Sequence, residues 1–291
     1  MKETKGEKIF YFVNTLFMIL LTLGIIYPIV YVISASFSSR EAILTGKVVL
    51  FPVDANLEAY KYVFADRQIW ISYLNSFFYT IVGTATAMAV TILGAYPLSK
   101  SVLPGKKIIT FAIVLTMWFG AGTIPMYLNY RDLGLLNTRA AIILGSACSA
   151  YNFILLRNFF TAIPRSLEEA ADIDGAGQWT ILSKIYLPLS LPSIATISLF
   201  YAVARWNSYF WEMIILSDDS LMPLQVVIKK LIVDLKGVAA KSDSVDLSML
   251  KYSEETVVYA SIVVSAVPML VLYPFIQKYF VKGVMVGAVK A

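Results

Sequence analysis

The sequence predicts an all-α membrane protein with six transmembrane helices. Three observations lead to this fold class. Of the 291 residues, 58% are hydrophobic and only 15% are charged, and the mean hydropathy is +0.72. The charged residues also come in clusters separated by long uncharged runs. Because a hydrocarbon core about 30 Å thick is crossed by roughly 20 apolar helical residues, each long run is a candidate span.

The first four spans are expected in gaps between charged residues. A fifth is expected from about Leu189 to Leu216, with two charges inside it, and a sixth between Glu255 and Lys278. The first apolar run, Ile9 to Phe37, is longer than the core of a cleaved signal peptide, so we expect it to be retained. The four gaps lie between Lys8 and Arg40, between Arg67 and Lys100, between Lys107 and Arg131, and between Arg139 and Arg157.

The distribution of Lys and Arg predicts how the spans are oriented. With six spans, one face carries both termini and the segment from Ile163 to Pro188, and its net charge is +6, against −1 on the opposite face. Because basic loops stay on the cytoplasmic side, we expect a multi-pass protein of the prokaryotic cytoplasmic (inner) membrane with both termini in the cytoplasm. We attribute the pI near 9.0 to this membrane orientation and not to nucleic-acid binding. The sequence contains no run of Lys and Arg with interleaved aromatic residues, which nucleic-acid binding would favour.

The absence of certain residues excludes several kinds of chemistry. The chain has no His, and its single Cys, Cys148, is expected to be a packing residue of the fourth span. A disulfide, a Cys/His metal site and a His-activated nucleophile are therefore excluded. No G-x-x-x-x-G-K-[ST] sequence occurs, so the chain does not bind ATP by that route. We expect no catalytic residue, no metal site and no cofactor bound by this chain.

The segment from Ile163 to Pro188 is polar and contains glycines, unlike the rest of the chain. Ser166 and Glu169 have the spacing of a capping box, which predicts that a short helix begins there. Gly175 and Gly177 are expected to end this helix in a left-handed turn. A second helix is expected from about Gln178 to Ile185, before Pro188 and Pro192 open the fifth span. The first helix would present a narrow face made of Leu167, Ala170, Ala171 and Asp174.

Two other interpretations of this elbow are open on physical grounds. It can be a solvated amphipathic loop without a partner. Its acidic residues can also be catalytic carboxylates, although no His or metal-type partner lies near them. Those residues are Glu168, Glu169, Asp172 and Asp174.

The spacing of the elbow resembles the EAA loop of ATP-binding-cassette importer permeases. Glu169-Ala170-Ala171 is followed after three residues by Gly175, after nine more by Ile185, and after one more by Leu187-Pro188. The pattern also stands just before the penultimate expected span, as it does in that family. The resemblance implies the type I importer permease (MetI-like) fold as a single domain over residues 1–291.

The resemblance also implies partners and roles. In that family the loop docks in a cleft of a cytoplasmic ATPase dimer, which binds ATP and Mg²⁺ and whose closing motion reaches the membrane helices through the loop. The working unit contains two permeases, so a sister permease is implied, together with an extracytoplasmic solute-binding protein. The docking role falls on Glu169, Ala170, Ala171 and Gly175, with Asp172 and Asp174 as auxiliaries.

Two further stretches resemble the sugar-transporting branch related to the maltose importer. Residues 204–212, read as ARWNSYFWE, are similar to its W-N-x-Y-x-W stretch, although Glu212 stands where relatives more often have Pro. The C-terminal run YFVKGVMVGAVKA is similar to its basic, Gly-spaced tail, which can reach between the ATPase subunits. By position, that tail contact falls on Gly283, Gly287 and Lys290.

Arg205 and Glu212 are charged residues inside the fifth expected span, where a charge is costly and usually functional. Seven residues apart in one helix, they would be separated by roughly 10 Å along its axis, too far for a direct bond. One hypothesis is that they face a translocation path for sugars. The alternative is that they hold the bundle or two subunits together. The hypothesised path residues are Arg205, Trp206, Asn207, Tyr209, Trp211 and Glu212.

Two long loops are expected on the external face, at residues 38–68 and 217–255. In the second, apolar residues recur at helical spacing from Leu224 to Leu235, which predicts an amphipathic helix. That helix would pack either on its own bundle or on the binding protein.

The sequence thus predicts a permease subunit of an ATP-driven carbohydrate importer, with an oligosaccharide as the favoured cargo. The chain contacts membrane lipid and is not itself an enzyme. One alternative is the same machine with a peptide or amino acid as cargo. A more distant alternative is a stand-alone secondary transporter, for which Glu212 would be the only candidate ion-coupling acid in mid-membrane.

Overall fold

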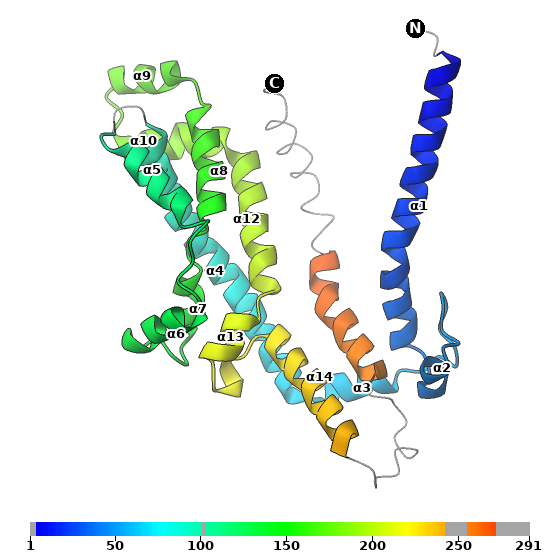
Figure 1. Cartoon of the computed structure of the whole chain (residues 1–291). Helices are drawn as coiled ribbons and strands as arrows, with labels where there is room; N and C mark the ends of the chain where they lie inside the picture. Colours follow the sequence, from blue (N-terminus) through cyan, green and yellow to red (C-terminus); the bar gives the residue numbers. More distant parts are fainter. Residues whose placement is uncertain (1–3, 101–102, 242–254, 272–291) are drawn as a thin grey trace. The chain divides into compact units, whose positions relative to one another are not determined.

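A computed structural model describes residues 4–100, 103–241 and 255–271, and all regular elements in these ranges are helical (Figure 1). This confirms the all-α prediction. The chain divides into two compact units. One comprises Met1–Ile69 with Ile228–Val267, and the other comprises Trp70–Val227 with Pro268–Ala291.

The first unit contains the long helix α1 (Lys5–Ser36). Thr4 caps it in a reciprocal capping box with Glu7, and its apolar side chains are exposed along most of its length, as expected of a helix that faces lipid. Near its end Ser36 and the hydroxyl of Tyr60 are hydrogen-bonded at 2.8 Å. The predicted loop 38–68 contains the short helices α2 (Arg40–Leu44) and α3 (Glu58–Ala65).

This unit has a small hydrophobic core near the end of α1. Ala35, Ala42 and Val48 are buried, and Tyr31 packs beside them. The rings of Tyr31 and Tyr259 are in edge-to-face contact, with their centroids 5.8 Å apart. The helix Glu255–Val271, which carries Tyr259, is therefore held at the end of α1.

The second unit is built around α4 (Arg67–Ser99), which begins in the first unit. Its core contains the fully buried side chains of Ala87 and Ala95, together with Leu156, Ile181 and Ile197 from later helices. The other elements that lie wholly between residues 70 and 227 are α5 (Lys106–Leu115), α6 (Thr123–Asp132), α7 (Arg139–Gly145), α8 (Ala150–Thr161), α9 (Arg165–Ile173), α10 (Gln178–Ile181), the π-helix η1 (Leu182–Tyr186), α11 (Leu187–Leu189), α12 (Leu191–Trp206), α13 (Phe210–Ile215) and the 3₁₀-helix η2 (Asp219–Leu221). The helix α14 (Leu224–Lys241) begins in the second unit and continues into the first from Ile228.

Two helices in the described ranges, α1 and α4, are long and apolar enough to cross a membrane alone. The number rises to four if α7 with α8, bent by 49°, and Gln178–Leu189 with α12, bent by 82°, each form one span. The third expected span is interrupted between α5 and α6, where Gly122 has φ +87°, a conformation that favours glycine. The sixth is described as far as Val271. The count of six spans therefore remains a prediction.

The predicted amphipathic helix of loop 217–255 is present as α14. Its first residues are fixed to α4 through backbone groups. The Asn75 side chain donates to the carbonyls of Ser220 and Met222, at 2.7 and 3.1 Å, and the Tyr79 hydroxyl donates to that of Leu221 at 2.8 Å. Leu224 at the start of α14 is fully buried. The start of this loop therefore packs on its own bundle.

The elbow is present, but it begins differently from the prediction. The capping box of Ser166 and Glu169 is wrong, because the helix α9 already starts at Arg165 with Pro164 in the N-cap position and no side-chain cap. The fixed φ of Pro164 directs the chain into the helix.

The elbow also ends differently from the prediction. Gly175 has φ +77° and ends α9 as expected, whereas Gly177 has φ −73° and is the extended N-cap of α10. The second helix continues past Ile185 to Leu189 through the π turn η1. A π turn widens the helix just before Pro188, whose ring would otherwise press on the carbonyl four residues earlier.

The two elbow glycines form a matched pair for substitution. No atom lies within 4 Å of a Cβ built on either residue, so neither substitution causes a clash. Gly175→Ala lowers the free energy of unfolding by about 1 kcal/mol, because alanine is strained in the left-handed conformation. Gly177→Ala causes no such strain, because Gly177 has a negative φ. We expect Gly175→Ala to lower the thermal unfolding midpoint of the detergent-purified chain and Gly177→Ala to leave it unchanged. Equal midpoints for the two variants would contradict the assigned turn.

Candidate coupling surface and the break in span five

The outer face of the elbow is a continuous set of exposed residues. Glu169, Ala170, Asp172, Asp174 and Gly175 from the predicted docking set are exposed, whereas Ala171 is half-buried. We call these exposed residues, together with the exposed Ile173 and Trp179, the coupling surface.

Sequence reasoning missed the two large apolar residues of this surface. Ile173 is 87% exposed and Trp179 is 73% exposed. Both stand in a polar segment, and that contrast is the signal that could have identified them. Exposed apolar side chains beside acidic ones are typical of a protein interface, in which aromatic residues supply much of the binding energy.

The inner face of the elbow packs on the membrane helices. Ala171 and Ala176 pack against the core cluster of the second unit, which includes Leu182 and Tyr186. The amide of Ala176 donates to the carbonyl of Ala171 at 2.9 Å, which closes the turn. Small side chains therefore let the elbow lie close against the bundle.

The acidic residues of the elbow do not form a metal-binding group. Glu168 is paired with Lys100 and accepts a hydrogen bond from the Tyr186 hydroxyl at 2.9 Å. Among the residues that the structure describes, no group of three or more His, Cys, Asp or Glu is placed to hold a metal ion.

The fifth expected span is broken in the middle of its aromatic stretch. The helix α12 ends at Trp206, Asn207 is its C-cap, and α13 starts at Phe210. The expectation that Arg205 and Glu212 share one continuous helix is therefore wrong. Non-helical backbone at membrane depth is tolerated where it is buried in protein or lines a polar cavity.

Arg205 is buried, and its guanidinium caps the end of another helix. It donates to the carbonyls of Ile142 and Ile143 at 2.6 and 3.0 Å and to the Ser146 hydroxyl at 3.0 Å. These carbonyls belong to the last turn of α7, where backbone acceptors lack helical partners and a cation is favourable. Arg205 thus fixes α7 to α12 at the point where the fourth expected span bends.

Gly83 makes room for this contact on α4. A Cβ at Gly83 would lie 2.9 Å from Nε of Arg205. The glycine therefore allows α4 to approach the guanidinium closely.

The other predicted path residues divide into buried and exposed groups. Trp206 is buried and packs against the rings of Tyr73 and Phe77, with centroids 6.3 and 5.2 Å away. Glu212 is buried and accepts a hydrogen bond from Ser208 at 2.9 Å. Half-buried Trp211 packs against Tyr130, whereas Asn207 and Tyr209 are exposed at the break.

Comparison with known proteins decides the family. The model of the family described as binding-protein-dependent transport system inner membrane component matches residues 3–286. The chain belongs to this family. Its members are transport components and not enzymes, and their transport depends on a binding protein, so the alternative of a stand-alone secondary transporter is excluded.

Individual relatives of this permease share nearly their whole length with it. The polygalacturonan/rhamnogalacturonan transport permease of Bacillus subtilis is 43% identical over 94% of this chain and 96% of its own. The diacetylchitobiose uptake permease NgcG of Streptomyces coelicolor is 28% identical over 93% and 86%.

A solved structure has the same fold. A chain of a bacterial ABC transporter that imports the acidic polysaccharide alginate is 45% identical, has a TM-score of 0.87, and is matched over 96% of this permease and 99% of that chain. The resemblance to importer permeases is thereby confirmed. The tail residues Gly283, Gly287 and Lys290 lie outside the described residues.

The role of Arg205 can be separated from that of its exposed neighbour. Arg205→Lys loses the forked donor that reaches two carbonyls and a hydroxyl, and we expect it to destabilise the chain by roughly 2–3 kcal/mol. Asn207→Ala removes only a bond to the carbonyl of Val203 and should cost less than about 1 kcal/mol. Thermal unfolding in detergent measures both, and a smaller loss for Arg205→Lys than for Asn207→Ala would refute the capping role.

Proposed function

We propose that this permease is the membrane-spanning subunit of an ATP-driven importer whose cargo is an acidic oligosaccharide, one that carries carboxylate groups. The observation that carries the proposal is its 45% identity and 0.87 TM-score to a chain of an alginate importer. The relative at 43% identity is named for polygalacturonan, which is also a polymer of uronic acid. Relatives at 24–28% identity include permeases named for diacetylchitobiose and lactose, which are neutral sugars.

The break between α12 and α13 is where we place part of the cargo path. Asn207 and Tyr209 are exposed there, and their amide and hydroxyl groups can bond with the hydroxyls and carboxylates of a sugar acid. Arg205, Trp206, Trp211 and Glu212 support this site from the bundle through the contacts described above. In this arrangement the two exposed residues contact the cargo and the other four position them.

The coupling surface is where we place the ATPase dimer, which supplies the ATP and Mg²⁺ chemistry. Its carboxylates suit a cleft with basic residues, and Ile173 and Trp179 suit apolar pockets in that cleft. This assignment requires the elbow and both termini to be cytoplasmic, as the net charge of +6 on that face supports.

The remaining partners follow from the same machine. A sister permease completes the translocation path, and the binding protein delivers the cargo at the external loops 38–68 and 217–255. The C-terminal residues Gly283, Gly287 and Lys290 would contact the ATPase.

Substitution in the coupling surface tests the docking assignment. Ile173→Ser and Trp179→Ser should each weaken ATPase binding at least tenfold, because each removes an apolar anchor of the surface. The measurement is the amount of ATPase subunit that co-purifies with the permease. Lys107→Gln, at an exposed position of α5 outside the surface, is the control and should retain full binding. Full binding by both serine variants would refute the assignment.

Uptake by the complete transporter tests the cargo. In proteoliposomes with its binding protein, oligogalacturonate or alginate oligosaccharides should be taken up at least tenfold faster than neutral oligosaccharides of equal length. Asn207→Ala and Tyr209→Phe should raise KM for the acidic cargo, because each removes a bond to it. Equal or faster uptake of the neutral oligosaccharides would overturn the acidic assignment, and unchanged kinetics in both variants would overturn the path assignment.

A further inference from the structure

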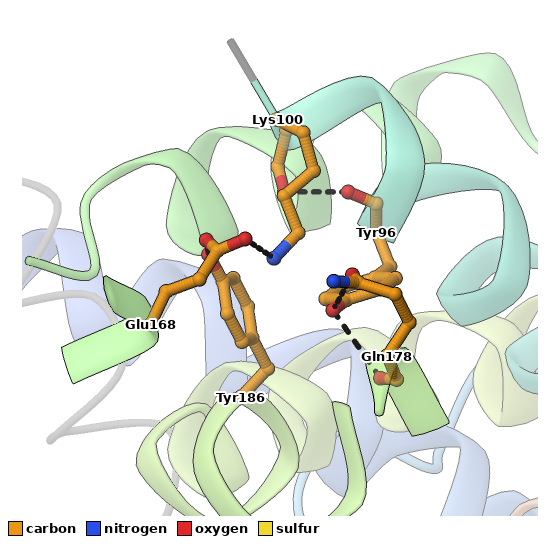
Figure 2. A network of polar contacts seen from close by, with 6 residues as sticks. Tyr96, Lys100, Glu168, Gln178 and Tyr186 are labelled. Atoms are coloured by element: carbon orange, nitrogen blue, oxygen red, sulfur yellow. Dashed lines mark hydrogen bonds and ion pairs between the residues drawn. The ribbon is translucent and has the colours of Figure 1, made fainter. Parts of the chain in front are cut away.

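Lys100 lies directly after the end of α4 and points toward the elbow. Its ammonium forms an ion pair with Glu168 of α9, and the two side chains are only 13% and 19% exposed (Figure 2). The same ammonium lies between two aromatic rings, 4.3 Å from the centroid of Tyr96 and 4.4 Å from that of Tyr186. One cation therefore contacts α4, α9 and η1 together.

The two rings connect this cation to the rest of the elbow. The Tyr186 hydroxyl donates to the second carboxylate oxygen of Glu168 at 2.9 Å. The Tyr96 hydroxyl donates to the side-chain oxygen of Gln178, the first residue of α10, at 2.8 Å. The two rings are in edge-to-face contact, with their centroids 5.0 Å apart. We call Lys100, Glu168, Tyr96, Tyr186 and Gln178 the lysine cluster.

The lysine cluster is stronger than an ordinary surface ion pair. Exposed pairs contribute little because water screens them, whereas a pair that is mostly withdrawn from water and flanked by aromatic faces keeps more of its attraction. Burial alone lowers the pKa of Lys100, but the contacts with Glu168 and Tyr96 outweigh it and the net pKa is raised above 10.5. The ammonium therefore stays charged at neutral pH and loses its charge only as the pH rises through that raised pKa.

Separating the pair would leave each charge without its partner. The ammonium would stay between two rings without a carboxylate, and the carboxylate would keep only the Tyr186 hydroxyl. Breaking a mostly buried ion pair is much more costly than breaking an exposed one. A displacement of α9 should therefore carry the end of α4 with it.

We propose that Lys100 is a positioning residue that transmits movement of the elbow to α4. The inference rests on the proposed docking of an ATPase at the coupling surface, which would supply that movement. The exposed side chains of α9 face the partner, and Glu168 on the same short helix is attached to α4 through Lys100. The lysine cluster is thus the link between the docking surface and a membrane-spanning helix.

The experiment compares variants in the complete transporter, reconstituted with its ATPase and binding protein. Two quantities are measured: the ATPase subunit that co-purifies, and the cargo transported per ATP hydrolysed. Lys100→Met and Glu168→Gln should keep the ATPase bound but lower cargo per ATP at least fivefold. Lys100→Arg, which preserves the charge and the ring contacts, should keep at least half of it. Lys107→Met, on an exposed neighbouring lysine, is the control and should behave as the unaltered transporter.

A double variant shows whether the two residues act as a pair. Lys100→Met with Glu168→Gln should be no worse than either single variant, because the same interaction is removed. Unchanged cargo per ATP in Lys100→Met would overturn the inference. Loss of bound ATPase in both single variants would overturn it too, because the pair would then be needed for docking or folding and not for transmission. If the unaltered permease binds no ATPase, the proposed function itself fails, and that result is distinct from either of these.

Discussion

The close approach of other side chains to α4 is the constraint on which the second unit depends. Gly94 admits the ring of Phe153 from α8, because a Cβ at that position would lie 2.5 Å from a ring carbon. Gly83 admits the guanidinium of Arg205 from α12 in the same way. Both contacts are possible only where α4 lacks a side chain. The two glycines thus determine how near α8 and α12 can come to this helix, and the buried core between them follows from that distance.

Helix breaks, together with the buried groups that satisfy them, explain why this bundle departs from straight spans. At the end of α7, two carbonyls accept hydrogen bonds from the Arg205 guanidinium. At the start of α8, the amide of Ser149 donates to the Tyr201 hydroxyl at 3.1 Å. Backbone groups at membrane depth need such partners because no water is present to replace them. The charged residue that appears costly in the sequence is therefore the group that makes the neighbouring break stable.

The sequence predicts those features of the fold that one segment determines by itself. It does not predict the features that depend on contacts between segments far apart in the chain. Long uncharged runs predicted α1 and α4, and the glycine at 175 predicted the left-handed turn, because hydropathy and φ preference are properties of one segment. That Arg205 holds the bundle together was one of its two predicted roles, but its carbonyl partners were not predictable, because they lie some sixty residues earlier in the chain. The capping box predicted at Ser166 is also wrong. Ser166 and Glu169 have the spacing of the motif, but the helix begins at Arg165, directly after Pro164.

The contacts of α4 also show how its two ends can act together. Near its beginning, Asn75 and Tyr79 hold the backbone of residues 220–222, and further along Thr91 is hydrogen-bonded to the Tyr201 hydroxyl at 2.8 Å. At its other end Tyr96 and Lys100 hold the elbow. Each contact joins α4 to a different segment, and all are buried or partly buried. Contacts at separate points along one helix give that helix a partner at each end and in the middle. A displacement at the elbow would then reach the segment before α14 through α4.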